Sequence, residues 1–281
     1  MSKKIKALLT TLLIIFLIFI SSFVYATISE YSAAQTQAEI KSSAVISEVN
    51  SVLTALGETN LVSTTAKSKI NLNAKTDIMR DINYYTVSTQ DYQINVDSTT
   101  NKVVNIYNLT SNLSSVPTTT KDVAESYITK MYSELNLPSD YDLVYLEPIA
   151  EKFWEADFQK NYGGTYNMYE AVKVIFSPAN EEIIALTVFD ESYSQIATLS
   201  AECNTEECIS TLSIDEDYIE DISVSFIKPS TLVNTGSTDS SIHKAKVIKQ
   251  VIPQEEDVNL VTLTYIDFYT GEYLGGDTLQ W

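Results

Sequence analysis

The chain has 281 residues, of which 44% are hydrophobic, and this is enough apolar material for two or three small domain cores. Its formal net charge of −19 argues against a nucleic-acid partner, because binding to phosphates requires positive charge. Seven glycines in the whole chain, with no glycine-rich phosphate loop among them, argue against a nucleotide-binding domain.

The first 26 residues have the pattern of an export segment. A lysine-rich start precedes the apolar run Ala7–Ile20, and the segment ends at the small residue Ala26. This pattern predicts a signal peptide or a membrane anchor. If it is not cleaved, the stretch 7–26 can span a bilayer as a helix, with the lysines in the cytoplasm. The protein is therefore expected to be extracytoplasmic, either membrane-anchored and bitopic with its C-terminus outside, or secreted after cleavage near Ala26.

Helical patterns follow at intervals along the chain. Apolar residues recur at helical spacing over Ser32–Leu56 before Gly57, and a second helix is predicted after Thr119 and before Pro138. A polar stretch around Pro117 separates these two regions and predicts a linker. Only a short helix, over Ser213–Asp221, is expected in the last third of the chain.

The last hairpin, Val261–Asp277, is the clearest element of the sequence. Its first strand is rich in β-branched and aromatic residues. Asp267 can accept hydrogen bonds from the backbone of the turn, and Gly271 can take a positive φ there without steric cost. These residues predict two antiparallel strands joined by a tight turn.

Two looser copies of this hairpin occur earlier in the chain. The recurring positions are Asp97, Thr100 and Asn101 in the first hairpin, Ser177 and Asn180 in the second, and Asp267, Thr270, Gly271 and Glu272 in the third. The turns are spaced 80 and then 90 positions apart, which suggests a repeated small domain. The alternative is three unrelated hairpins that share common turn residues.

The last hairpin resembles the end of a PepSY-type domain. Asp267, Thr270, Gly271 and Glu272 match that pattern, and Gly275-Gly276-Asp277 is similar to the tail of tandem PepSY-like extracytoplasmic proteins. The resemblance is clearest here and weaker toward the N-terminus. It implies a helix packed on a small antiparallel sheet, without catalytic residues. Members of the family include pro-regions of secreted metallopeptidases and envelope proteins of spore germination.

The sequence therefore predicts an α+β fold in which the N-terminal hydrophobic helix is followed by about three small units. The predicted units are residues 27–112, 118–192 and 193–281, each with a helix packed on an antiparallel sheet and the third poor in helix.

The two cysteines, Cys203 and Cys208, are expected to form a disulfide outside the cell. Their spacing lacks the C-x-x-C pattern of thiol oxidoreductases, and a zinc site would need more ligands than these cysteines and the single histidine. His243, which a Ser-His-Asp triad would have to use, is not accompanied by G-x-S-x-G. The sequence thus predicts no catalytic, cofactor-binding or metal-binding residues.

The leading functional hypothesis is a non-catalytic PepSY-like protein that interacts with or restrains another envelope or secreted protein, for example a peptidase. Tyr162, Tyr166 and Tyr169 surround one turn and form either a contact patch or edge-strand packing. Two alternatives stay open. One is binding or hydrolysis of a cell-wall polymer by tyrosines and carboxylates. The other is a calcium-responsive envelope protein, suggested by the acidic stretch Glu202–Asp221, although this stretch lacks the spacing of a calcium loop.

Overall fold

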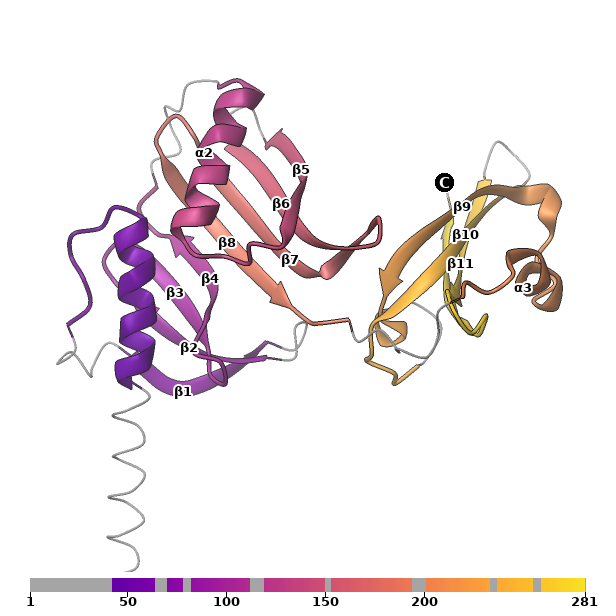
Figure 1. The fold of residues 1–281 in the computed structure, drawn as a ribbon, viewed down its shortest axis with the longest axis horizontal. Coiled ribbons are helices and arrows are strands. Elements are labelled where there is room, and N and C mark those ends of the chain that lie inside the picture. The colour runs from indigo at the N-terminus through magenta and orange to yellow at the C-terminus, as the bar shows by residue number, and fades with distance from the viewer. Residues whose placement is uncertain are drawn as a thin grey trace, which may run out of the picture. The chain divides into compact units, whose positions relative to one another are not determined.

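The computed structural model describes residues 42–63, 70–77, 82–111, 119–149, 153–193, 201–232, 237–254 and 259–280. In these residues, twelve β-strands form two antiparallel sheets (Figure 1). The expected export segment and the linker residue Pro117 lie outside the described residues. Within the described ranges, no helix is both long enough and apolar enough to cross a bilayer.

The described residues up to Val103 form the first compact unit. Residues 42–55 are helical, and the strands are β1 (Ile70–Asp77), β2 (Ile82–Ser88) and β3 (Tyr92–Asp97). The helix buries a stripe with helical spacing: Val45, Ile46, Val49, Val52 and Leu53. Opposite residues of β2 and β3, such as Val87 and Ile94, are also fully buried, so this helix and these strands share a core.

From Val104 onward, the described residues belong to the second compact unit. Its first part contains β4 (Val103–Asn108), α2 (Lys121–Glu134), β5 (Tyr141–Ile149), β6 (Phe153–Tyr162), β7 (Thr165–Ser177) and β8 (Glu182–Asp190). Helix α2 lies across one face of these strands (Figure 1). The rings of Tyr132 on α2 and Phe158 on β6 stack with their centroids 4.0 Å apart. This aromatic contact and the buried Ile128 hold α2 to the sheet.

The C-terminal part of this unit is the second sheet, of the order β12-β11-β10-β9. Its elements are α3 (Thr205–Thr211), the 3-10 turns η2 (Glu216–Tyr218) and η3 (Pro229–Thr231), β9 (Ile219–Ile227), β10 (His243–Pro253), β11 (Asn259–Asp267) and β12 (Tyr273–Gln280). Helix α3 packs on one face, where Cys208 and Ile209 contact Ile248 and Ile266. The helix thereby covers the middle of the sheet.

The expected α+β fold is wrong, because the described residues are mostly β. The strands expected to form two separate sheets make up one sheet of the order β1-β2-β3-β4-β8-β7-β6-β5. The pairing of β4 with β8, which places Asn105 opposite Thr187, joins hairpins that are far apart in the sequence. Alternating hydrophobicity identifies a strand but does not specify its neighbour, so the sequence pattern did not reveal this pairing.

Of the short helix expected over Ser213–Asp221, only the 3-10 turn η2 forms there, and the α-helix lies earlier in the chain. The helix is α3, which begins directly after Asn204, and the Asn204 side chain accepts hydrogen bonds from the N–H groups of Glu206 and Glu207. This is an N-cap, which satisfies backbone donors at the start of a helix. Ile219 already belongs to β9, because the chain after α3 is needed as an edge strand of the second sheet.

Candidate functional site

The turn between β11 and β12 is organised by one carboxylate. Asp267 Oδ1 accepts hydrogen bonds from the N–H groups of Tyr269 at 3.0 Å and Thr270 at 2.8 Å. Thr270 Oγ1 in turn accepts the N–H of Glu272 at 3.2 Å. Gly271 follows with φ of 72°, in the left-handed region that glycine adopts without strain. Side-chain acceptors and a glycine thus close the turn locally.

The turn at Asp97 has the same hydrogen bonds. Asp97 Oδ1 accepts the N–H groups of Thr99 at 2.8 Å and Thr100 at 2.6 Å. Asn101 takes the position of the glycine with φ of 58°. Asparagine is the non-glycine residue that tolerates this conformation best, which explains why the same turn forms without a glycine.

The turn at Ser177 is a weaker version. Ser177 Oγ accepts the N–H of Asn180 at 3.4 Å, and the next residue, Glu181, has φ of 53°. Glu181 therefore takes the place that Gly271 has in the last hairpin. It is a residue that the sequence analysis did not single out, and its position in the alignment of the three turns is the signal that identifies it.

The single histidine bridges two segments of the second sheet. His243 Nδ1 lies 3.0 Å from Asp267 Oδ2, so the carboxylate that organises the last turn also contacts the imidazole. On the other side of the ring, Nε2 lies 3.0 Å from Asp239 Oδ2 and 3.0 Å from Ser241 Oγ. We call Asp239, Ser241, His243 and Asp267 the histidine clamp.

The electrostatics of the clamp favour an imidazolium between two carboxylates. The hydrogen bond to Asp267 raises the pKa of His243 against the opposing effect of burial, and the hydrogen bond to Asp239 adds to this increase. Burial alone would raise the pKa of Asp267, but hydrogen bonds from His243 and from the backbone of Thr270 and Tyr269 lower that pKa to about 2. Hydrogen bonds from Ser241 lower the pKa of Asp239. The clamp therefore places one carboxylate on each side of the ring.

The arrangement contains a serine, a histidine and an aspartate within hydrogen-bond distance, as a hydrolase triad does. However, Ser241 Oγ donates to Asp239 Oδ1 at 2.5 Å, and Asp239 also occupies Nε2 of His243. A general base needs a free lone pair on that nitrogen when it takes the serine proton. The contacts with Asp267 and Asp239 raise the pKa of His243, which favours the protonated ring of an ionic bridge over the neutral ring of a general base.

The clamp lines a cavity of about 470 Å³. The lining residues are Glu191, Ser192, Tyr193, Ser240, Ser241, Ile242, His243, Lys244, Asp267, Tyr269, Thr270 and Glu272. Two tyrosines, acids and a lysine therefore face the same space as the clamp. Residues of this kind make both aromatic and polar contacts at protein interfaces, which makes this cavity the candidate site.

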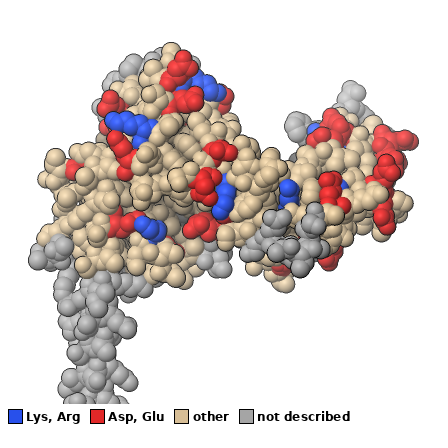
Figure 2. Space-filling view, viewed as in Figure 1, with Lys and Arg blue, Asp and Glu red and all other residues tan. Residues whose placement is uncertain are grey.

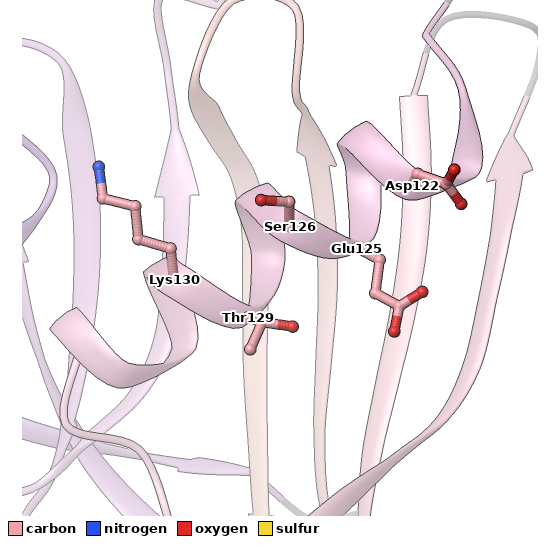
Figure 3. Close-up of a pocket in the computed structure, with 5 residues that line it drawn as sticks. All are labelled: Asp122, Glu125, Ser126, Thr129 and Lys130. Carbon is pink, nitrogen blue, oxygen red and sulfur yellow. The ribbon is translucent and has the colours of Figure 1, made fainter.

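A larger hollow, of about 580 Å³, lies on the outer side of α2 and is a poorer candidate (Figure 3). All its lining residues come from that one helix: Asp122, Glu125, Ser126, Thr129 and Lys130. Figure 3 shows them spread along the helix, with Asp122 and Lys130 toward opposite ends. Lys130 pairs with Glu134 within the helix, so the side chains do not converge on a common point.

Comparisons with known proteins identify no family. No family model matches the chain, and no curated protein matches it. Among solved structures, the C-terminal domain of Bacillus megaterium YpeB is similar with a TM-score of 0.43 and 10% sequence identity. That match covers 82% of this chain and 95% of the other.

The expected disulfide is absent from the structure, in which Cys203 and Cys208 are free thiols. The two Sγ atoms lie 3.4 Å apart, within hydrogen-bond distance but well beyond the length of a disulfide bond. Burial raises the pKa of Cys203 to about 11, and the hydrogen bond with Cys208 acts in the same direction. At neutral pH Cys203 is therefore protonated and a weak nucleophile. The spacing of the cysteines indicated that they lie together, but spacing does not determine whether a bond forms.

The three tyrosines around the turn between β6 and β7 do not form one surface. Tyr162 donates a hydrogen bond to the buried Glu170 at 2.5 Å, and Tyr169 Oη accepts the N–H of Lys228 at 3.2 Å. Tyr166 is exposed, at 40% of its surface. Tyr162 and Tyr169 are thus used within the unit, and Tyr166 alone of the three points its ring to solvent.

The described residues contain no group of three or more histidine, cysteine or acidic side chains placed to hold a metal ion. The exposed acidic stretch is nevertheless dense. Figure 2 shows acidic side chains gathered over the C-terminal sheet in the region of α3. Binding of calcium there stays an untested alternative.

The free energy of unfolding should depend on pH in the way expected of a charged His243. Because its folded pKa is raised above its ordinary value of 6.5, the clamp's contribution is complete below pH 6.5 and is lost as pH rises through the folded pKa. Asp267, with its pKa lowered from 3.8 to about 2, contributes above pH 3.8 and loses its contribution as pH falls toward 2. Between these limits, His243→Gln should lower the unfolding free energy by about 2 kcal/mol.

The measurement is urea denaturation of both proteins from pH 4 to 9. The difference between wild type and His243→Gln should be largest between pH 4 and 6.5 and should shrink at higher pH. If the difference in unfolding free energy between the two proteins is the same at every pH in this range, the imidazole is neutral throughout. That result would contradict a charged histidine in the clamp.

Proposed function

We propose that the chain is a non-catalytic extracytoplasmic protein that binds and restrains another envelope or secreted protein. The observation that carries this proposal is the histidine clamp. The only histidine of the chain lies in the main candidate cavity but is occupied on both ring nitrogens by Asp267 and Asp239. Such a site can hold two segments in a fixed geometry, and its histidine is engaged by two carboxylates rather than free to act as a base.

The composition of the cavity supports binding. Tyr193 and Tyr269 offer aromatic surface, and Lys244 and Glu272 offer charges of both signs on the same walls. Aromatic residues framed by polar groups are common at the centres of protein interfaces. The extracytoplasmic location rests on the lysine-rich start and the apolar run Ala7–Ile20, and the PepSY-like character rests on the Asp267 turn.

The proposal is tested by crosslinking the full-length chain in membranes and in culture medium, each analysed separately. We expect one envelope or secreted protein to be enriched in a fraction, and we expect its own activity to fall when purified full-length chain is added. The control is the same capture with His243→Gln, whose cavity walls lose the clamp. If no protein is enriched, or if the captured protein keeps its full activity, the proposed restraint is wrong.

A second arm tests catalysis directly. The purified chain is treated with a fluorophosphonate, which modifies activated serines, and separately with purified wall polymer. We expect no modification of Ser241 and no release of soluble fragments. Labelling that disappears in Ser241→Ala, or turnover of the polymer, would instead establish an enzyme and would contradict the non-catalytic assignment.

A further inference from the structure

Strand β9 is an open edge of the C-terminal sheet. Among the described residues, β9 pairs only with β10, from His243 opposite Ile227 to Gln250 opposite Ile219. All five residues from Glu220 to Val224 are exposed. Along an antiparallel ladder, every second residue directs its N–H and C=O away from the paired strand. Over residues 220–224, the outer edge of β9 therefore presents backbone donors and acceptors to solvent.

The side chains of this edge alternate in chemistry. Ile222 lies opposite Ile248 and Asp221 lies opposite Lys249, so neighbouring residues point to opposite faces of the sheet. Ile222 and Val224 share one face and are 43% and 39% exposed. Asp221 and Ser223 share the other face. An added strand would thus meet apolar side chains on one face and an acid on the other.

The charges around the β9 edge favour a partner segment of opposite charge. Acidic residues surround the start of the strand: Asp215, Glu216, Asp217, Glu220 and Asp221. Lys249 pairs with Glu220, which leaves most of these acids without a cation in the described residues. In a chain of net charge −19, such an edge attracts a basic segment and repels an acidic one.

Edge strands are often protected against pairing with a further strand, and the eight-stranded sheet contains one such protecting feature. Strand β5, at one end of the eight-stranded sheet, contains Pro148, which cannot donate a backbone hydrogen bond. Strand β9 has a register shift opposite Lys249 and Gln250 but no proline and no lysine. Its centre, Ile222 to Val224, is therefore regular and unprotected.

We infer that β9 binds an extended basic segment of a partner protein as an additional strand. The partner's apolar side chains lie over Ile222 and Val224, and its lysine or arginine side chains lie toward Asp221. The backbone of β9 supplies the hydrogen bonds, and the alternating side chains supply the preference for sequence. This inference rests on the proposed function, because it names the surface and the kind of partner that such a binding protein would use.

The test uses the full-length chain and a ten-residue peptide of alternating valine and lysine. Hydrogen exchange of backbone amides, measured with and without the peptide, should slow over residues 219–225. A peptide with the same valines and lysines in two blocks is the control for charge alone, and we expect it to give no protection there. Equal protection by both peptides, or protection confined to other residues, would overturn the inference.

Variants locate the binding surface. Ile222→Lys combined with Val224→Lys should weaken binding of the alternating peptide by about tenfold, because the valine side chains of the peptide then lie against charged groups instead of apolar ones. Leu109→Lys combined with Val123→Lys is the matched control. Both of these control residues are exposed, and the charge change is the same. Thermal unfolding verifies that all variants are folded. An equal loss of peptide binding in the two double variants would refute specific binding at the β9 edge.

The partner found by crosslinking separates the two proposals. If the Ile222→Lys and Val224→Lys variant still captures and restrains that partner, the edge is not the interface and the inference fails, while the proposed function stands. If the wild-type chain captures no partner but the alternating peptide protects β9, the proposed function fails and binding of an added strand is supported.

Discussion

Replacing Gly271 by alanine should lower the free energy of unfolding by about 3 kcal/mol, through two separate effects. Gly271 has φ of 72°, which alanine adopts only with strain. In addition, a Cβ on Gly271 would lie 2.9 Å from Sγ of Cys208 and 3.5 Å from Cβ of Cys203. Both cysteine side chains are short and lie in the core between α3 and the sheet, so they cannot swing away as a long surface side chain would.

Gly163→Ala is the matched control for this prediction. Gly163 has φ of 64°, but a Cβ there meets no atom within 4 Å. Its replacement should therefore cost only the backbone strain, about 1 kcal/mol. Urea denaturation of both variants measures the difference. In the double variant, Cys208→Ala should recover part of the loss from Gly271→Ala, because it removes the clashing sulfur. Equal losses for the two glycines would show that the cysteines do not crowd the turn.

The turns were the part of the fold that sequence reasoning described best. Asp267 and Gly271 act within a few residues of their own positions, and so does Asn101, which adopts the left-handed conformation expected of asparagine. Glu181 has the same conformation without any such preference, and the strands on either side hold it there. Interactions of short range can be inferred from residue types because both partners lie in the same stretch of sequence.

Long-range features were not predictable in this way. His243 and Asp267 come from different strands, β10 and β11, and meet only because of the register that places Ala245 opposite Asp267. The pairing of β4 with β8 depends on the same kind of information. A lysine side chain is ordinarily found at the surface, because burying a charge is costly. Instead, Lys246 lies beneath the segment that leads into α3, so the face of β10 that carries this lysine is buried.

Lys246→Met should destabilise the C-terminal sheet by about 3 kcal/mol, because it removes a buried cation from fixed acceptors. Lys246 is 2% exposed, and its ammonium group donates to the carbonyl of Cys203 at 2.6 Å and to Thr205 Oγ1 at 2.5 Å. It also pairs with Glu202 at 2.7 Å. Methionine retains the aliphatic stem, so the loss measures the missing hydrogen bonds rather than a cavity.

Lys249→Met provides the comparison on the same strand. Lys249 is 40% exposed and pairs with Glu220 at the surface, so its removal should change stability by less than about 1 kcal/mol. Hydrogen exchange adds a local readout. In Lys246→Met, the amides of residues 203–211 should exchange faster than in Lys249→Met, because α3 loses an anchor to β10. If both variants lose the same stability and α3 stays equally protected, the helix is held by its contacts with Ile248 and Ile266 and the buried lysine is dispensable.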